Sequence, residues 1–253
     1  MVMRMMMKTK WRLYTSFIML TALFSSATYA NTTPLTSFQA DYIVYRAGKS
    51  HGTAHRYLTH TEQGYELGYS SDISWMIFSD KRQETSRFII ENDNIHPLRY
   101  TMQRSGTGPN RYYELNLNPE TKVVTEGKAR KAKAIKWQED WLDPISYQLQ
   151  LVLDLKAGKT EFRYNVLNRS GNSKTYHYKI VAEEMLALPY GNTKTLRIVR
   201  TEQNSNKQIY AWVAPELDYM LVRLWSGEDN VEQFDVQLHK LVLTPIKQTN
   251  DTP

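Results

Sequence analysis

Short segments in which apolar and polar residues alternate recur along most of this 253-residue chain. Because successive side chains of a β-strand point to opposite faces, each segment predicts a strand with one buried face and one solvated face. That arrangement is typical of antiparallel sheets. The apolar positions of the clearest segments are Phe38, Ala40, Tyr42 and Val44; Tyr113, Leu115 and Leu117; Phe162, Tyr164 and Val166; Tyr176, Tyr178 and Ile180; and Phe234, Val236 and Leu238.

Turn-forming sequences separate these segments at short intervals. Among them are "AGKSHG", "ENDN", "SGTGPN", "PYGN" and "SGEDN", in which glycine and asparagine supply the positive φ that tight hairpins need. Many short strands joined by close turns predict a sandwich, a barrel or an open half-barrel. No internal repeat or long linker interrupts the pattern, so we expect one β-rich domain over residues 38–243.

One helix is predicted, within "WLDPISYQLQLVLDLKAGK" at residues 141–159. Asp143 suits the N-cap, Pro144 suits the first helical position, and Gly158 suits the C-terminal end. Helical spacing places the side chains in two apolar stripes and one narrow polar arc. The first stripe is Ile145, Leu149, Val152 and Leu153; the second is Tyr147, Leu151 and Leu155; the polar arc is Ser146, Gln150 and Asp154.

The width of the apolar surface on this helix predicts how it packs. An ordinary amphipathic helix has an apolar stripe only a little wider than ~100°, and this helix is apolar over roughly twice that width. We therefore expect it to be covered on two sides. The predicted fold is mostly β, with a curved antiparallel sheet, a half-barrel or open barrel, wrapped around one main α-helix.

Residues 1–30 have the pattern of a secretory signal peptide. A positive region is followed by an apolar run over residues 13–24 and by "SSATYA", which predicts cleavage after Ala30. The apolar run is shorter than the ~20 residues that a membrane-spanning helix needs, which argues against a retained anchor. Residues 31–37 then form a polar leader, and residues 244–253 form a polar C-terminal tail.

Charge and cysteine content constrain the partners and the location of the mature chain. The signal segment carries four basic and no acidic residues, so its removal lowers the net charge from +6 to +2. This leaves no electrostatic argument for nucleic acid as a partner. The chain has no cysteine, and therefore neither disulfides nor the lipidated residue of a lipoprotein. With no further segment apolar enough to span a membrane, we expect a monomer in the periplasm of a Gram-negative cell.

Residues for catalysis or metal binding are sparse. His51, His55 and His60 lie close in sequence, but only the first two share a face of a strand, and zinc needs three or four convergent ligands. We expect these histidines to face solvent. Adjacent carboxylates such as Glu183 and Glu184 point to opposite faces of a strand, and the chain has neither a nucleophile elbow nor a phosphate-binding glycine loop. The sequence predicts no catalytic residue, metal site or cofactor.

Three further segments each have two interpretations. The basic run "GKARKAKAIK" at residues 127–136 suits a solvated edge strand or loop, or else a contact with anionic head groups. The apolar "WMIF" at residues 75–78 suits ordinary core, or else the mouth of a cavity. Arg223, on an apolar strand that follows the predicted hairpin turn "APELDY", needs a carboxylate partner if it points inward. Glu216 and Glu202 are the candidates, and anion recognition is the alternative.

The chain resembles a family of bacterial exported proteins, domain of unknown function 3108. "FQADYIVYRAGKSHGTA", "WLDPISYQLQL", "LPYGNTKTLRIVR" and "YAWVAPELDYMLVRL" occur in the order typical of that family. Leu221 stands where family members often have proline. The family has no established catalytic residues, so the resemblance assigns none here. The most specific positions are Trp212, Ala214, Pro215, Glu216, Leu217, Tyr219, Val222 and Arg223.

A looser resemblance, at the level of shape, is to the periplasmic Lol lipoprotein carriers, half-barrels with helices on the concave side. Together these observations predict non-enzymatic binding of a lipid or another amphipathic molecule of the cell envelope. The predicted ligand contacts are Tyr147, Leu151 and Leu155 on the helix, with Trp137 and Trp141 before it. An envelope scaffolding protein without a small ligand is the first alternative. An acyl- or glycan-processing enzyme is the second.

Overall fold

The structure of the protein is a computed structural model. It describes residues 35–118, 120–121, 123–126, 131–133, 137–168, 172–201, 206–229 and 231–244, with backbone alone for 123–126 and 131–133. The predicted signal peptide and most of the predicted leader and tail lie outside the described residues.

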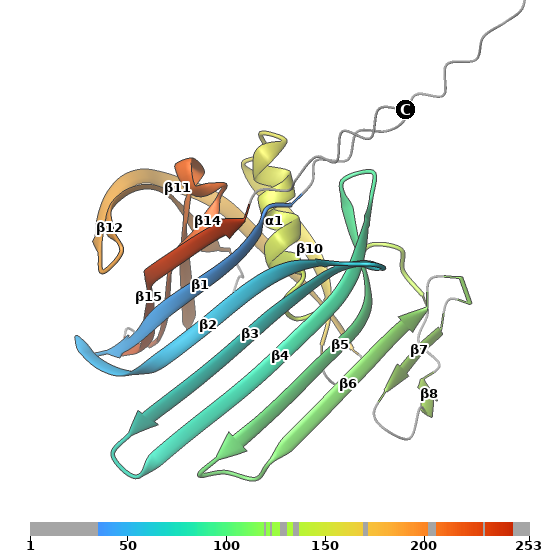
Figure 1. Ribbon diagram of the computed structural model, residues 1–253, viewed down its shortest axis with the longest axis horizontal. Helices are drawn as coiled ribbons and strands as arrows, with labels where there is room; N and C mark the ends of the chain where they lie inside the picture. Colours follow the sequence, from blue (N-terminus) through green and yellow to red (C-terminus); the bar gives the residue numbers. More distant parts are fainter. Residues whose placement is uncertain are drawn as a thin grey trace, which may run out of the picture. The chain divides into compact units, whose positions relative to one another are not determined.

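A single sheet contains all the strands of the described residues, and it is antiparallel except at one end (Figure 1). The first half of the chain supplies β1 (Ser37–Arg46), β2 (Lys49–Thr61), β3 (Gly64–Trp75), β4 (Phe78–Glu91), β5 (Asn94–Gly106), β6 (Arg111–Asn118), β7 (Val123–Glu126) and β8 (Lys131–Lys133). The second half supplies β9 (Trp141–Leu142), β10 (Glu161–Leu167), β11 (Ser173–Leu188), β12 (Gly191–Arg200), β13 (Lys207–Ala214), β14 (Met220–Glu228) and β15 (Val231–Thr244).

The first and last strands pair in the middle of this sheet. From one edge to the other, the order runs from β8 down to β1, then from β15 down to β9. The sheet is therefore two meanders joined along β1 and β15, with Phe38 opposite Leu243 and Val44 opposite Val236. The terminal strands β8 and β9 do not pair with each other, so the sheet is large and curved but not closed into a barrel.

Local turn chemistry explains why neighbouring strands form hairpins. Between β4 and β5, Asn92 and Asp93 have φ of +50° and +60°. Two consecutive residues with positive φ make the type of turn whose twist matches that of paired strands, and asparagine and aspartate tolerate it. Ala47 and Gly48 do the same between β1 and β2, with φ of +48° and +72°.

The alternation seen in the sequence is confirmed by burial. In β1 the predicted apolar positions Phe38, Ala40, Tyr42 and Val44 are all at most 5% exposed. The corresponding positions of β6 and β10 are buried or half-buried and belong to the same core. One face of the sheet thus supplies the core, as an antiparallel sheet with one wet face requires.

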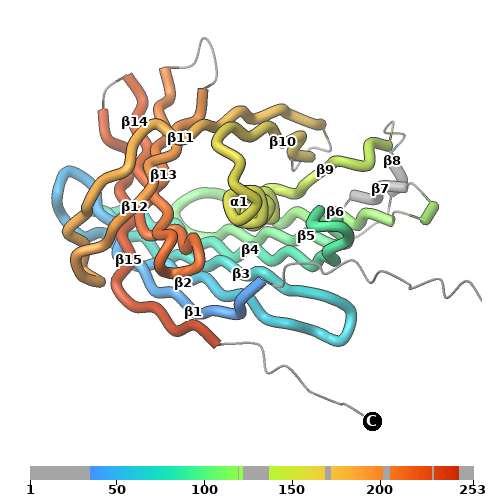
Figure 2. Tube along the Cα trace, turned by 90° about the horizontal axis from the view of Figure 1, so that it is seen from above, coloured from blue at the N-terminus to red at the C-terminus, as the bar shows by residue number. Residues whose placement is uncertain are grey.

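One α-helix occurs in the described part of the chain, α1 (Tyr147–Lys156), together with a short 3₁₀ turn, η1 (Pro215–Leu217). Figure 2 shows α1 end-on, with β3 to β5 on one side of it and β10 on the other. The helix contacts β5 and β10, and β9 lies against β5. No residue of α1 is classed as exposed. No helix among these residues has the length and hydrophobicity needed to cross a membrane.

Candidate ligand-binding site

A buried carboxyl group fixes the start of α1. Asp143 Oδ1 accepts the backbone N–H groups of Ile145 and Ser146, each at 2.9 Å, and Ser146 Oγ accepts the N–H of Asp143 at 3.0 Å. This exchange is a capping box with serine in the third position. Ser86 of β4 donates to the other carboxyl oxygen. Asp143 therefore caps the turn that leads into α1, whereas the helix begins later than predicted, at Tyr147 with Ser146 in the N-cap position, so Pro144 lies in the turn before it. Burial raises the pKa of Asp143.

The polar arc of α1 is deeply buried. Gln150 accepts the N–H of Ile95 at 2.8 Å and donates to the carbonyl of Asp93 at 3.0 Å, so it joins the helix to the start of β5. Asp154 accepts the hydroxyl of Tyr164 on β10 at 2.8 Å. Both side chains are less than a tenth exposed. The polar arc of α1 thus bonds to β5 and to β10 inside the protein. The sequence pattern did not reveal these contacts.

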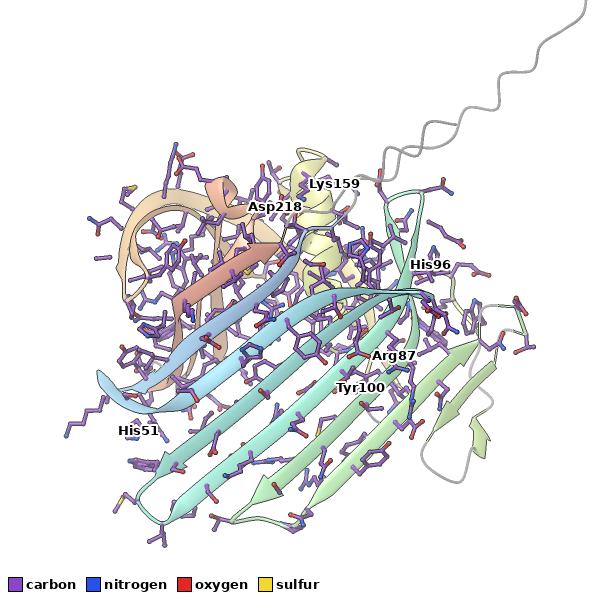
Figure 3. The ribbon with its side chains drawn as sticks, in the orientation of Figure 1. His51, Arg87, His96, Tyr100, Lys159 and Asp218 are labelled. Carbon is purple, nitrogen blue, oxygen red and sulfur yellow. The ribbon has the colours of Figure 1, made fainter. Side chains whose placement is uncertain are left out.

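The end of α1 is fixed as firmly as its start. Gly158 has φ of +80°, and its N–H and that of Lys159 bond to the carbonyls of Leu155 and Asp154. This pair of bonds is a Schellman motif, confirming the predicted glycine stop. Lys156 forms a 2.6 Å ion pair with Asp218, which follows η1. Figure 3 shows Asp218 close to this end of the helix.

An apolar cavity of about 90 Å³ lies along one side of α1. The helix contributes Tyr147, Leu151 and Val152 to its wall. The sheet provides the remaining apolar lining, which includes Leu58, Ile198, Ile209, Ala211, Val213 and Leu221. Asp218 lies at the wall as well, already paired with Lys156.

A second cavity, of about 370 Å³, lies between the start of α1 and strands from both halves of the sheet. Most of its lining is apolar, and we call it the polar cavity because four charged residues, Arg56, Asp80, Arg82 and Glu84, also line it. Its two carboxylates both have partners. Glu84, 5% exposed, accepts the hydroxyl of Tyr100 at 2.5 Å and lies 3.5 Å from Arg82. Asp80 accepts two hydrogen bonds from Arg104, at 2.7 and 3.1 Å. Both carboxylates of this cavity are therefore already paired with an arginine.

Arg56 lies where these two cavities meet. It lines both of them, as do Gln148, Leu221 and Leu224. Only 7% of Arg56 is exposed, and its guanidinium carbon lies 5.9 Å from the ring centre of Phe38. Among the described residues it forms no ion pair. Two arginines, Arg56 and Arg82, line the two cavities, and Arg82 is paired with Glu84. Arg56 has no carboxylate partner among the described residues.

A surface hollow of about 560 Å³ adjoins the polar cavity. It shares Arg82 and Pro144 with the polar cavity, and Tyr147 with the apolar cavity. The ring of Tyr147 stacks on that of Tyr178 with centres 6.0 Å apart. Burial raises the pKa of the Tyr147 hydroxyl, so it stays protonated. Tyr147 therefore forms a neutral aromatic wall between the apolar cavity and the hollow.

The residues predicted to contact a ligand do not all lie together. Tyr147 and Leu151 line the apolar cavity. Leu155 is 4% exposed and lies in the core, outside the lining of that cavity. Trp137 and Trp141 pack edge to face at 5.9 Å, also away from it. Neither indole N–H has a hydrogen-bond partner in the described chain.

The histidines form no metal site among the described residues, where no group of three or more candidate ligands occurs. His55 Nδ1 lies 2.6 Å from a carboxylate oxygen of Asp41. His60 is exposed and lies against the ring of Tyr65 at 4.3 Å. These are surface contacts on β2, in agreement with the solvent-facing interpretation, although His51 and His55 are half-buried.

Both interpretations of residues 75–78 were wrong. Trp75, Met76, Ile77 and Phe78 are 41%, 84%, 83% and 53% exposed, so they are not core. They form the turn between β3 and β4 and do not line the three hollows described above. Sequence alone could not distinguish an apolar turn from an apolar strand end, because both are short runs between polar residues.

Part of the basic run lies where the edge-strand interpretation predicts. Lys131–Lys133 form β8, the last strand at one end of the sheet. Residues 127–130 and 134–136 lie outside the described chain.

The predicted salt bridge of Arg223 is confirmed, but with another partner. Its guanidinium donates to both carboxylate oxygens of Asp235 on β15, at 2.8 and 2.7 Å, and lies 4.7 Å from the ring centre of Trp212. Glu216 is not its partner, and Glu202 lies outside the described residues. The pairing of β14 with β15 brings Asp235 close, and sequence separation gave no hint of it.

Sequence reasoning missed Arg56 as a site residue, although the sequence contained a signal. Ala54, Arg56 and Leu58 occupy alternate positions of β2 and are all buried. A single cation at an inward position between two apolar residues predicts a buried charge. Glu84 occupies a similar inward position in β4, between Arg82 and Ser86. Its polar neighbours hid the pattern.

Comparison with known proteins identifies the family. A profile described as "Protein of unknown function (DUF3108)" matches residues 41–234. The chain belongs to this family. That match confirms the resemblance inferred from the sequence, and it assigns no activity.

The fold also has a relative among solved structures. The crystal structure of a beta-barrel-like protein of domain of unknown function DUF1849 from Brucella abortus is similar, with a TM-score of 0.59. The similarity covers 85% of this chain and 100% of that one at 9% sequence identity, so it supports a shared fold alone. None of the curated protein sequences compared with the chain matches it.

Proposed function

We propose that this DUF3108 protein binds an amphipathic molecule on the concave side of its sheet, in the periplasm, without catalysing a reaction. The observation that carries the proposal is that the apolar cavity and the polar cavity, whose mostly apolar wall also carries charged groups, share the lining residues Arg56, Gln148, Leu221 and Leu224 beside α1. An amphipathic ligand needs both environments next to each other.

The volumes indicate how such a ligand would be divided between the cavities. The polar cavity, about 370 Å³, lies within the range of roughly 300–1,000 Å³ that is usual for small-molecule sites. The apolar cavity, about 90 Å³, is smaller than that range and holds only a short stretch of hydrocarbon as it stands. A longer chain requires α1 or the strands beside it to move.

The packing of α1 supports the idea that the sheet wraps around the helix. Its polar arc bonds to β5 and β10, and its second apolar stripe faces the apolar cavity at Tyr147 and Leu151. A helix covered on several sides within a curved sheet leaves space for a ligand only where its packing is incomplete. The periplasmic location is supported by the signal-peptide pattern of residues 1–30.

The non-enzymatic part of the proposal is supported by the state of the carboxylates. Asp80, Glu84 and Asp218 line the cavities, and each is paired with a cation. A general acid or base needs a pKa and a position suited to proton transfer, and carboxylates held in ion pairs are poorly suited to it.

Native mass spectrometry of protein purified from periplasm without detergent tests this function. We expect a bound species of lipid-like mass that organic extraction removes. Incubation of the extracted protein with envelope lipids should restore the species. A mass that stays that of the bare chain in both experiments contradicts ligand binding and favours the envelope scaffolding function.

A further inference from the structure

We infer that the ligand carries an oxyanion, a carboxylate or a phosphate, and that Arg56 binds it. This inference rests on the proposed binding function and names the chemistry of the ligand's polar end. An arginine guanidinium is a cation that offers several donors in a planar fork that matches an oxyanion.

No carboxylate among the described residues compensates the charge of Arg56. A buried charge is costly unless it is paired, and buried arginines are normally paired. The described contacts of Arg56 are the ring of Phe38 and the hydroxyl of Tyr42, both neutral. The Tyr42 hydroxyl itself donates to the carbonyl of Leu221 at 2.8 Å. A neutral ring and a neutral hydroxyl offset only part of the cost of burying a cation.

The nearby carboxylates do not supply the missing negative charge. Glu84 is held by Tyr100 and Arg82, Asp80 by Arg104, and Asp218 by Lys156. An incoming anion is therefore the group that would balance Arg56. Because Arg56 lines both cavities, an anion bound to it has apolar lining on one side and the larger polar cavity on the other.

Binding of single-chain amphiphiles of equal length tests the inference. The probes are dodecanoate, dodecyl phosphate and dodecanol, with acetate and inorganic phosphate as anions that lack the chain. We expect the wild-type protein to bind at least one of the two long-chain anions about tenfold more tightly than dodecanol, because a buried charged hydrogen bond contributes on that scale. The two anions also separate a carboxylate from a phosphate preference.

Arg56→Gln should reduce the affinity for the preferred anion to about that for dodecanol. The matched control is Arg87→Gln, which removes the same charge from an exposed position of β4 (Figure 3). It should keep the wild-type preference. If Arg56→Gln fails to fold, the comparison of anion with alcohol in the wild-type protein still decides the matter.

The outcomes separate this inference from the proposed function. Equal wild-type affinity for dodecanol and both anions overturns the role of Arg56 and leaves ligand binding intact. Binding of acetate or phosphate as tightly as the long-chain anions overturns the amphipathic ligand and keeps the anion site. No binding of any probe, together with a bare mass in the native spectrum, overturns both.

A second and independent inference concerns the exposed turn between β3 and β4. We infer that this turn, residues 75–78, which we call the apolar tip, inserts into a lipid surface that carries anionic head groups. Met76 and Ile77 are more than four-fifths exposed, and Trp75 and Phe78 stack beside them at 6.3 Å. Four consecutive exposed apolar residues on one turn are unusual for a surface that meets only water.

The surroundings of the apolar tip match a bilayer in charge and in residue type. Arg46 lies over the ring of Trp75 at 4.6 Å, and His51 meets its edge at 6.4 Å, at the end of the molecule that Figure 3 marks with His51. Lys49 pairs with Arg46 across the β1–β2 hairpin, and neither forms an ion pair with the described residues. The acidic groups nearby already have partners. Asp72 is paired with Lys81, and Asp80 is paired with Arg104. Glu232 accepts the N–H of Ala47 and the indole N–H of Trp225. Tryptophan and basic residues around an apolar insert are typical of membrane interfaces.

Sedimentation with vesicles tests this inference. We expect the protein to sediment with vesicles of phosphatidylcholine and phosphatidylglycerol, and the double variant Met76→Ser with Ile77→Ser to lose about tenfold in partitioning, since two apolar side chains no longer insert. The control is Met185→Ser with Val231→Ser, two exposed apolar residues at 64% and 57% on other strands. It should bind as the wild type does.

Two results overturn the bilayer as the partner. One is that the wild type sediments neither with mixed phosphatidylcholine and phosphatidylglycerol vesicles nor with pure phosphatidylcholine vesicles. The apolar tip would then be expected to bind a protein partner. The other is equal binding by the tip variant and the wild type. Equal wild-type binding to pure phosphatidylcholine vesicles would overturn the requirement for anionic head groups.

Discussion

Asp143 shows at the scale of one residue how a buried polar group organises its surroundings. Its carboxyl group receives two backbone N–H groups and the hydroxyl of Ser86, and so fixes the start of α1 against β4. Arg223 and Asp235 do the equivalent between two strands, with a bidentate pair beside Trp212. The first contact joins segments far apart in sequence, and the second joins the two strands of one hairpin.

Asp143→Ala should lower the free energy of unfolding by about 2–3 kcal/mol, because the turn that leads into α1 loses its cap and three buried donors lose their acceptor. Urea unfolding followed by circular dichroism measures the change. Asp140→Ala, in the exposed turn before β9, is the control and should change the free energy by less than about 0.5 kcal/mol. An equally small change for Asp143→Ala would mean that the cap contributes little.

The pKa of Asp143 leads to a prediction about pH. Because burial raises this pKa in the folded protein, the folded state holds the proton to a higher pH than the unfolded chain does. The group therefore contributes stability at low pH that is lost as the pH rises through its folded pKa. The free energy of unfolding of the wild type, relative to that of Asp143→Asn, should therefore decrease as the pH rises above ~4. The opposite slope would show that the N–H donors outweigh burial and lower the pKa.

At the scale of elements, α1 is held by polar contacts on one side and borders a cavity on another. Gln150 and Asp154 attach it to β5 and β10, whereas Leu151 is half-buried at the apolar cavity. The glycine stop at Gly158 and a polar turn at Asp143 before the helix were predictable because they depend on neighbouring residues alone. The direction in which each side of the helix faces was not, since it depends on strands distant in sequence.

Leu151→Asp should destabilise the protein by about 2–4 kcal/mol, because it places an unpaired charge against apolar lining. Thermal or urea unfolding measures the loss. Met185→Asp makes the same type of change at a site that is 64% exposed on β11, and should alter stability by less than about 0.5 kcal/mol. If the two variants behave alike, this face of α1 is not covered and the wrapped-helix proposal is wrong.

At the scale of the whole molecule, the order of strands places the two ends of the domain in the centre of the sheet. β1 and β15 each have a strand on both sides, whereas β7 and β8 lie at one end of the sheet. A central strand opens only when its neighbours separate from it, so local opening should be easiest at the edge.

Amide hydrogen exchange should therefore be slowest in β1 and β15 and fastest in β7 and β8. Peptides from residues 37–46 and 234–244, compared with those from 123–126 and 131–133, give the measurement by mass spectrometry. Equal protection at the edge and at the centre would indicate that another part of the chain or a partner covers the edge.

The sequence by itself determined the local features of this protein. Period-2 alternation identified strands such as β1 and β10, because side-chain direction in a strand depends only on position along it. Turn residues marked the hairpins, the caps marked α1, and the family resemblance followed from the same segments. All of these depend on interactions over a few residues.

Tertiary structure alone decided which segments meet. Strand order determines that β1 pairs with β15, that Arg223 meets Asp235, and that the polar arc of α1 is buried. Local propensities leave that order open. The position of Arg56 between two cavities and the exposure of residues 75–78 arise in the same way. A side chain's burial and electrostatic partners are set by whatever packs against it, and those residues come from distant parts of the chain.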